Sequence, residues 1–161
     1  MVRNIDDSFD EELSSVIRST EFIPEYLESY SFDVKIISGG EDDNIVIGLS
    51  SATSEKCPGM NQNTIGIYGF DGSICRDAEE VSTASSFTTG DLITCKVIRT
   101  KISNNTFTIT SCQFSKNGEL LGRPMNVGGK HHFPAVGLHS PGAIVQITLN
   151  TSPKIGNDVL N

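Results

Sequence analysis

Histidine and cysteine are the first residues to consider in this chain as zinc ligands or as a base and nucleophile pair. The cysteines are Cys57, Cys75, Cys95 and Cys112. They form no Cys-x-x-Cys pair, and no His-x-His or His-Cys spacing completes a zinc site. His131 and His132 are adjacent, so on an extended chain they would point to opposite sides. With His139 isolated, the sequence predicts no metal site and no cofactor.

Catalytic motifs are also absent from the sequence. There is no Gly-x-Ser-x-Gly, His-Glu-x-x-His, Gly-x-x-x-x-Gly-Lys-Ser/Thr or Gly-x-Gly-x-x-Gly. The acidic run 41–43 lacks the spaced oxygen ligands of a calcium loop. Cys95 and Cys112 fall on segments expected to pair as strands, where a free cysteine usually packs as a small apolar residue. We therefore expect a protein that is not an enzyme.

Composition and charge bound the remaining possibilities. The 161 residues allow one domain, 37% of them are hydrophobic, and no apolar stretch is long enough to span a membrane. Lys and Arg number 12 against 20 Asp and Glu, a net charge of −8, which argues against nucleic acid as a partner. Since no signal peptide is evident at the start, we expect a cytoplasmic or nuclear compartment and free thiols.

The acidity is concentrated at one end, and glycine at the other. Up to Asp43 there are 12 acids and 3 bases, and all 15 glycines lie at or after Gly39. We therefore expect an acidic lead-in (residues 1–14), with a short helical turn within 6–17, before a body dense in turns (15–150) and a tail (151–161).

Alternation and apolar runs predict strands through this body. Residues 31–37 alternate as a half-buried strand, and 45–49 read as a central strand, so we expect a hairpin through 39–44. Asn117-Gly118 favours a type I′ turn. Further expected strands are 64–68, 92–102, 106–115, 133–138 and 143–149. We expect hairpin turns at 69–72, 103–105 and 139–142, and a loop at 82–86.

These segments amount to about ten short strands with little helix, the pattern of an all-β antiparallel β-sandwich. Five motifs within them resemble, in type and order, those of a SPRY domain. The motifs are Pro58-Gly59, 66–72 (GIYGFDG), 87–91 (FTTGD), 112–118 (CQFSKNG) and 133–142 (FPAVGLHSPG). The chain is most similar to the Ran-binding-protein type and to SPRY domain-containing protein three.

This resemblance implies a bent, concanavalin-like sandwich without catalytic activity, which binds short peptide segments of a partner protein through loops at one rim. By the same resemblance, three segments should meet at that rim. They contribute Arg18, Ser19 and Thr20; Thr53, Ser54, Lys56 and Met60; and Ser140 and Pro141. Their cations, hydroxyls and apolar floor suit a polar or acidic peptide. Met60 stands where relatives usually have tryptophan, so any aromatic anchor must come from Tyr or Phe.

The sequence leaves three function classes open. The first hypothesis is a monomeric interaction domain, serving as a scaffold or substrate-recognition part of an intracellular complex such as a ubiquitin ligase, without membrane or nucleic-acid partners. A lectin-like, carbohydrate-binding sandwich is the alternative, weakened by the absence of tryptophan. An enzyme ranks third because no catalytic constellation is present.

Overall fold

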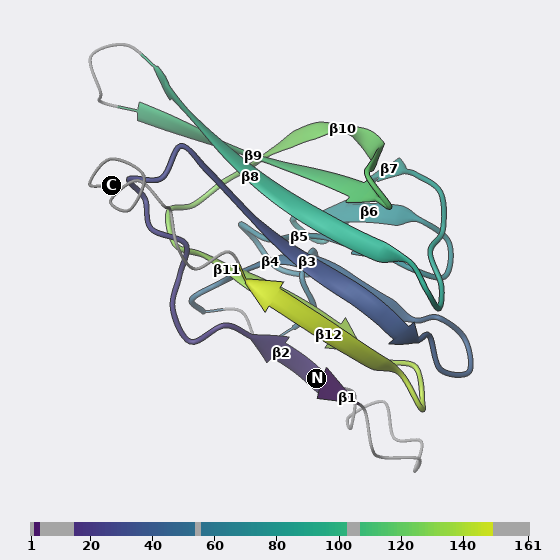
Figure 1. Cartoon of the computed structure of the whole chain (residues 1–161). Coiled ribbons are helices and arrows are strands. Elements are labelled where there is room, and N and C mark those ends of the chain that lie inside the picture. The colour runs from purple at the N-terminus through teal and green to yellow at the C-terminus, as the bar shows by residue number, and fades with distance from the viewer. Residues whose placement is uncertain (1, 4–14, 54–55, 103–106, 150–161) are drawn as a thin grey trace, which may run out of the picture.

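The computed structural model describes residues 2–3, 15–53, 56–102 and 107–149. In these ranges the chain forms two antiparallel six-stranded sheets packed face to face (Figure 1). The all-β sandwich expected from the sequence is confirmed. No helix in the described ranges is long and apolar enough to cross a membrane.

The first sheet contains the longest strands. It is built from β1 (Val2–Arg3), β3 (Ser29–Ser38), β8 (Leu92–Ile102), β9 (Phe107–Lys116), β10 (Glu119–Val127) and β12 (Ile144–Leu149). Their order across the sheet is β1-β12-β3-β8-β9-β10. Because β1 lies inside the expected acidic lead-in and pairs with β12, part of that lead-in belongs to the sheet. The boundaries 1–14, 15–150 and 151–161 stay a prediction.

The second sheet carries most of the candidate site. It is built from β2 (Ser15–Arg18), β4 (Ile45–Ser51), β5 (Ile65–Tyr68), β6 (Ser73–Arg76), β7 (Glu79–Thr83) and β11 (His132–Leu138). Their order is β2-β11-β4-β5-β6-β7. The strand β4 lies between β11 and β5 and is buried along nearly its whole length, as its apolar run predicts.

The core lies between the two sheets. Phe32, Val34 and Ile36 of β3 face inward with no exposed surface, while the intervening residues are only partly buried. From the second sheet, Ile47 and Leu49 pack into the same cluster. Each such aliphatic side chain stabilises the fold by about 1.5–3 kcal/mol relative to an exposed position. The period-two pattern of the sequence thus correctly identifies the buried face of β3.

Two expected hairpins are wrong. Segments 31–37 and 45–49 belong to β3 and β4, which lie in different sheets, and the final pair, β11 and β12, is also divided between the sheets. The turns 39–44 and 139–142 carry the chain across the sandwich, and Glu41 N donates to Pro141 O between them. Alternation marks which face of a strand is buried, but it does not identify the neighbouring strand, because the facing sheet can cover that face equally well.

Of the turns and loops expected from the sequence, the Asn117-Gly118 turn is confirmed, while the helical turn and the loop 82–86 are wrong at least in part. Asn117 and Gly118 have φ of 52° and 88°, as the expected type I′ turn requires. The helical turn is wrong where it is described, since Ser15–Arg18 form β2 and pair with β11. The expected loop 82–86 is also partly strand, because β7 extends to Thr83. The turn 103–105 and residues 6–14 lie outside the described residues.

Candidate functional site

Arg18 links three segments at one end of the second sheet. It ends β2 opposite Ala135 of β11. Its Nη1 donates hydrogen bonds to Ser51 O (2.7 Å), at the end of β4, and to Ala52 O (3.2 Å), just after it. Its Cζ lies 4.4 Å from the centre of the Phe133 ring. Two carbonyl partners and one ring occupy the guanidinium, so Arg18 is an organising residue of the site as well as a surface cation.

Aromatic side chains gather beside Arg18 around a hollow of about 770 Å³. We call it the aromatic hollow and define it by Glu21, Phe22, Glu25, Tyr26, His131 and Phe133. The Phe22 ring centre lies 4.4 Å from that of His131 and 6.0 Å from that of Phe133. Phe22 is 42% and Tyr26 is 74% exposed. Rings this open to solvent are typical anchors of protein interfaces.

The loop 19–28, which carries Phe22 and Tyr26, is held in place by buried residues and hydrogen bonds. Ile23 and Leu27 are buried, and Ile23 N donates a 2.8 Å hydrogen bond to His132 O. The buried Arg99 of β8 donates to the carbonyls of Ile23, Pro24 and Leu27. Burial lowers the pKa of Arg99. The exposed rings therefore stand on an ordered base.

The neighbouring histidines point to opposite sides, as expected from the sequence. His131 is exposed in the aromatic hollow and lies 3.4 Å from a Glu25 carboxylate oxygen. His132 is fully buried, its Nε2 donates a 2.7 Å hydrogen bond to Gly128 O, and burial lowers its pKa. Only His131 is therefore available to a ligand at this surface.

The segment after β4 folds back over the outer face of the second sheet. A Cβ on Gly66 would lie 2.4 Å from Pro58 O, so the absence of a side chain at Gly66 permits this approach. In the same segment, the Sγ atom of Cys57, the residue before Pro58, contacts the Nε2 atom of His139. Burial raises the pKa of Cys57 to about 11, so the thiol stays protonated near neutral pH. A protonated thiol is a weaker nucleophile than a thiolate, so burial works against reactivity at Cys57.

The residues expected at the rim are only partly brought together. Thr20, Thr53 and Lys56 are exposed, and Met60 is half-buried. Ser19 is half-buried, its amide donates to Pro134 O, and its hydroxyl donates to Glu21 O. The Arg18 hydrogen bonds place the first two segments beside each other. Ser54 lies outside the described residues.

The third expected segment follows the opposite end of β11. Ser140 is buried, and its hydroxyl accepts a hydrogen bond from Asp42 N (3.0 Å). Pro141 O accepts one from Glu41 N. Both residues therefore hold the turn 39–44 in place, away from the Arg18 end of β11.

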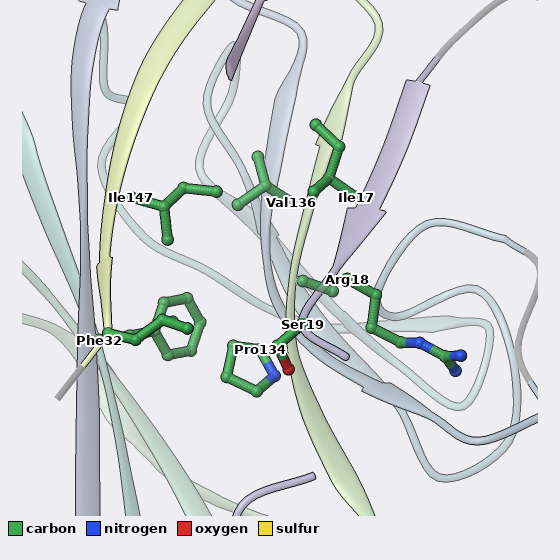
Figure 2. A pocket seen from close by; sticks show the side chains of 9 residues that line it. Ile17, Arg18, Ser19, Phe32, Pro134, Val136 and Ile147 are labelled. Atoms are coloured by element: carbon green, nitrogen blue, oxygen red, sulfur yellow. The ribbon is translucent and has the colours of Figure 1, made fainter. Parts of the chain in front are cut away.

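A smaller cavity of about 230 Å³ opens between the sheets at the β2 edge. Figure 2 shows Phe32 and Ile147 on one side, Ile17, Val136 and Pro134 on the other, and the Arg18 side chain extending away from Phe32 and Ile147. Its lining is mainly apolar. Within the described ranges no group of three or more His, Cys, Asp and Glu residues could hold a metal.

Comparison with solved structures identifies the fold. A crystal structure of a human SPRY domain superposes with a TM-score of 0.69 at 23% identity and covers 85% of each chain. The SPRY domain of human HERC1 superposes with a TM-score of 0.58 at 21% identity, covering 86% of this chain and 80% of that one. The two-sheet sandwich has the fold of a SPRY domain, as the resemblance of its motifs predicts.

Within this class the chain is similar to Ran-binding proteins 9 and 10. Over 140 residues it is 36% identical to Ran-binding protein 10 of Danio rerio and 35% identical to Ran-binding protein 9 of Homo sapiens, matching 85% of this chain. The chain spans 22% and 18% of the lengths of those relatives. The expected likeness to the Ran-binding-protein type is confirmed. No protein-family model matches.

Reasoning from the sequence missed the aromatic side of the site. Phe22, Tyr26 and Phe133 were not among the expected binding residues, and His131 was considered only as a metal ligand. A usable signal was present, since Phe22 and Tyr26 flank Pro24 outside every expected strand. Aromatic residues in a loop fixed by proline are candidates for an exposed anchor.

Proposed function

We propose that this SPRY domain binds short peptide segments of partner proteins at the aromatic hollow and the adjoining Arg18 end of the second sheet. The observation that carries the proposal is the pair of exposed rings, Phe22 and Tyr26, on a loop that Arg99 and two buried aliphatic residues hold in place. A fixed aromatic surface loses little conformational entropy when a segment binds.

This proposal keeps only some of the nine rim residues that were expected from the sequence to contact a peptide directly. Arg18, Ser19 and Thr20 lie at or beside the aromatic hollow, and Thr53 and Lys56 follow Ser51 and Ala52, to which Arg18 donates. Ser54 stays a prediction because it lies outside the described residues. Met60 is a secondary contact at most, because it is half-buried. Ser140 and Pro141 act indirectly, through the turn 39–44.

Wider roles of the chain follow from the resemblance alone. A scaffold or substrate-recognition part of a larger complex, including a ubiquitin ligase, is in keeping with a domain that binds segments of other proteins. The domain is proposed to act as a monomer without nucleic-acid or membrane partners, and the cytoplasmic or nuclear compartment stays a prediction.

Selection of binding peptides from a displayed library tests the proposal. Selected peptides are then titrated against the unchanged chain and the variants Tyr26→Ala, Lys56→Glu and Leu120→Ser. Leu120 is a matched control because it is 64% exposed on β10, in the other sheet. We expect Tyr26→Ala to weaken binding at least ~10-fold, as for an aromatic hot spot, Lys56→Glu to change it, and Leu120→Ser to leave it unchanged. Equal binding by all variants would overturn the proposed surface.

A further inference from the structure

The aromatic hollow carries acidic side chains beside its rings. We infer that it accepts a basic side chain, arginine or lysine, from the bound segment. This inference rests on the proposed function, because it names the side chain that the same surface would select. It also reverses the polarity expected from the sequence, which favoured a polar or acidic peptide on account of Arg18 and Lys56.

Charge around the hollow favours a cation. Glu21 and Glu25 line it, and among the described residues of its lining none is a lysine or an arginine. The nearby Arg18 guanidinium is occupied by the carbonyls of Ser51 and Ala52 and by the Phe133 ring. The buried Arg99 lies beneath the loop and its charge interacts with Glu25, but its guanidinium donates to backbone carbonyls below the hollow. The side chains of the described lining itself that carry a carboxylate or guanidinium charge are therefore Glu21 and Glu25. An incoming carboxylate would meet like charge, whereas an incoming guanidinium or ammonium would meet opposite charge.

The rings favour the same ligand. The face of an aromatic ring carries negative charge density and attracts a cation within about 6 Å of its centre. One ring of the hollow already does so, since the Cζ of Arg18 lies 4.4 Å from the Phe133 ring centre. Phe22 and Tyr26 offer further exposed ring surface beside Glu21 and Glu25. Rings and carboxylates together suit the flat, charged head of arginine and the long apolar stem of lysine.

Several groups of the hollow contact one another in the chain without a ligand. Glu25 lies 3.4 Å from His131, and the Phe22 ring packs 4.4 Å from the same imidazole. Below them, Pro24 O accepts a hydrogen bond from Arg99. A basic side chain would therefore enter a preformed site, where little binding energy is lost in ordering the protein.

Titration with short matched peptides, followed by nuclear magnetic resonance of the chain, tests the inference. The probes are four acetylated, amidated peptides Gly-Ser-X-Ser-Gly, in which X is arginine, citrulline, leucine or glutamate. Citrulline keeps the shape of arginine without its charge. We expect the arginine peptide to shift the Phe22 and Tyr26 resonances and to bind ~10-fold tighter than the citrulline peptide, equivalent to about 1.4 kcal/mol.

Two variants assign that preference to the carboxylates. The double substitution Glu21→Gln, Glu25→Gln should reduce the preference for arginine over citrulline to ~2-fold, because the rings remain while the charges are lost. Glu119→Gln, at an exposed residue that begins β10 in the other sheet, should leave the preference unchanged. Urea unfolding of each variant checks that the substituted chain is folded.

The outcomes separate this inference from the proposed function. Equal binding of the arginine, citrulline and leucine peptides, lost in Tyr26→Ala, would overturn selection of a basic side chain and leave peptide binding at the hollow standing. Tighter binding of the glutamate peptide would overturn it as well. If none of the four peptides shifts the hollow resonances while library-selected peptides bind there, the inference fails and the proposed function remains.

Discussion

The guanidinium of Arg99 on β8 donates a 2.5 Å hydrogen bond to the carbonyl oxygen of Pro24. This bond joins the first sheet to the loop that carries the aromatic hollow on the second. The same side chain reaches Ile23 O at 3.3 Å and Leu27 O at 3.5 Å, and the Arg99 amide donates to Glu28 O at 2.8 Å. A buried cation thus donates to three carbonyls of this loop, one of which, Pro24 O, also accepts a 3.2 Å hydrogen bond from Leu27 N.

Replacing Arg99 by methionine should destabilise the chain. We expect Arg99→Met to lower the free energy of unfolding by about 2–3 kcal/mol, because the hydrogen bonds from a charged group to three loop carbonyls are lost. Urea unfolding measures this loss, and hydrogen exchange at the Ile23 and Leu27 amides reports the loosening of the loop. Arg123→Met, at an exposed residue of β10, is the control. An unchanged urea midpoint for Arg99→Met would contradict the role assigned to this side chain.

Gly66 should not tolerate even one added methyl group. A Cβ there would lie 2.4 Å from Pro58 O, a backbone atom that cannot rotate away. We expect Gly66→Ala to cost about 1–3 kcal/mol by overpacking. Gly128→Ala is matched to it, since its Cβ would lie 2.6 Å from the Asn63 Oδ1, at the mobile end of a side chain. Thermal unfolding of both variants should show the larger loss for Gly66→Ala, and equal losses would contradict this account of the segment after β4.

The thiol of Cys57 should be unreactive in the folded chain. Burial raises its pKa from 9.0 to about 11, which lowers its thiolate fraction at pH 8 on the order of 100-fold. Alkylation by iodoacetamide, followed by mass spectrometry of the Cys57 peptide, should be slow without denaturant, fast in urea, and should keep accelerating as the pH approaches 11. Equal rates with and without urea at pH 8 would contradict the raised pKa of the buried thiol.

Asp91 should make stability fall in acid. Partial burial raises its pKa, but the hydrogen bonds from Thr88 N and Asn117 Nδ2, both 2.9 Å, and the charges of Lys116 and Lys35 outweigh it, so the net pKa is lowered. A lowered pKa in the folded chain contributes stability above the unfolded value of about 3.9, and this is lost as the pH falls through the folded value. The expected loss is below about 1 kcal/mol because the group is partly solvated.

Urea midpoints at pH 5 and below pH 3 measure this effect. The unchanged chain should lose more stability between them than Asp91→Asn, while the exposed control Glu119→Gln should behave like the unchanged chain. The same acid dependence in Asp91→Asn and the unchanged chain would assign the effect to other carboxylates.

Local structure was the part most open to prediction. The alternation of Phe32, Val34 and Ile36 and the run 45–49 identify buried strand positions, because burial of one or both faces directly sets the residue pattern. Asn117-Gly118 identifies a turn because both residues adopt positive φ there. The SPRY motifs extend this local information to a whole fold.

Long-range pairing was less accessible. The two hairpins expected at 39–44 and 139–142 are crossings between sheets, since a short turn can join strands within a sheet or across the sandwich. The missing information on strand pairing affected the predicted positions of the site residues most. Ser140 was expected beside Arg18, yet its hydroxyl pairs with Asp42 N beyond the opposite end of β11.

By itself, the sequence determined an all-β sandwich, because apolar periodicity and turn chemistry are local properties of neighbouring residues, and the resemblance of its motifs to those of a SPRY domain predicted the fold. Only the tertiary structure decided which exposed side chains meet. Arg99 anchors the loop of Phe22 and Glu25 from the other sheet, and the hydrogen bond from Ile23 N to His132 O brings that loop to His131. Those contacts join residues far apart in the chain, where no spacing rule operates, so the aromatic and acidic character of the surface emerges only from the folded chain.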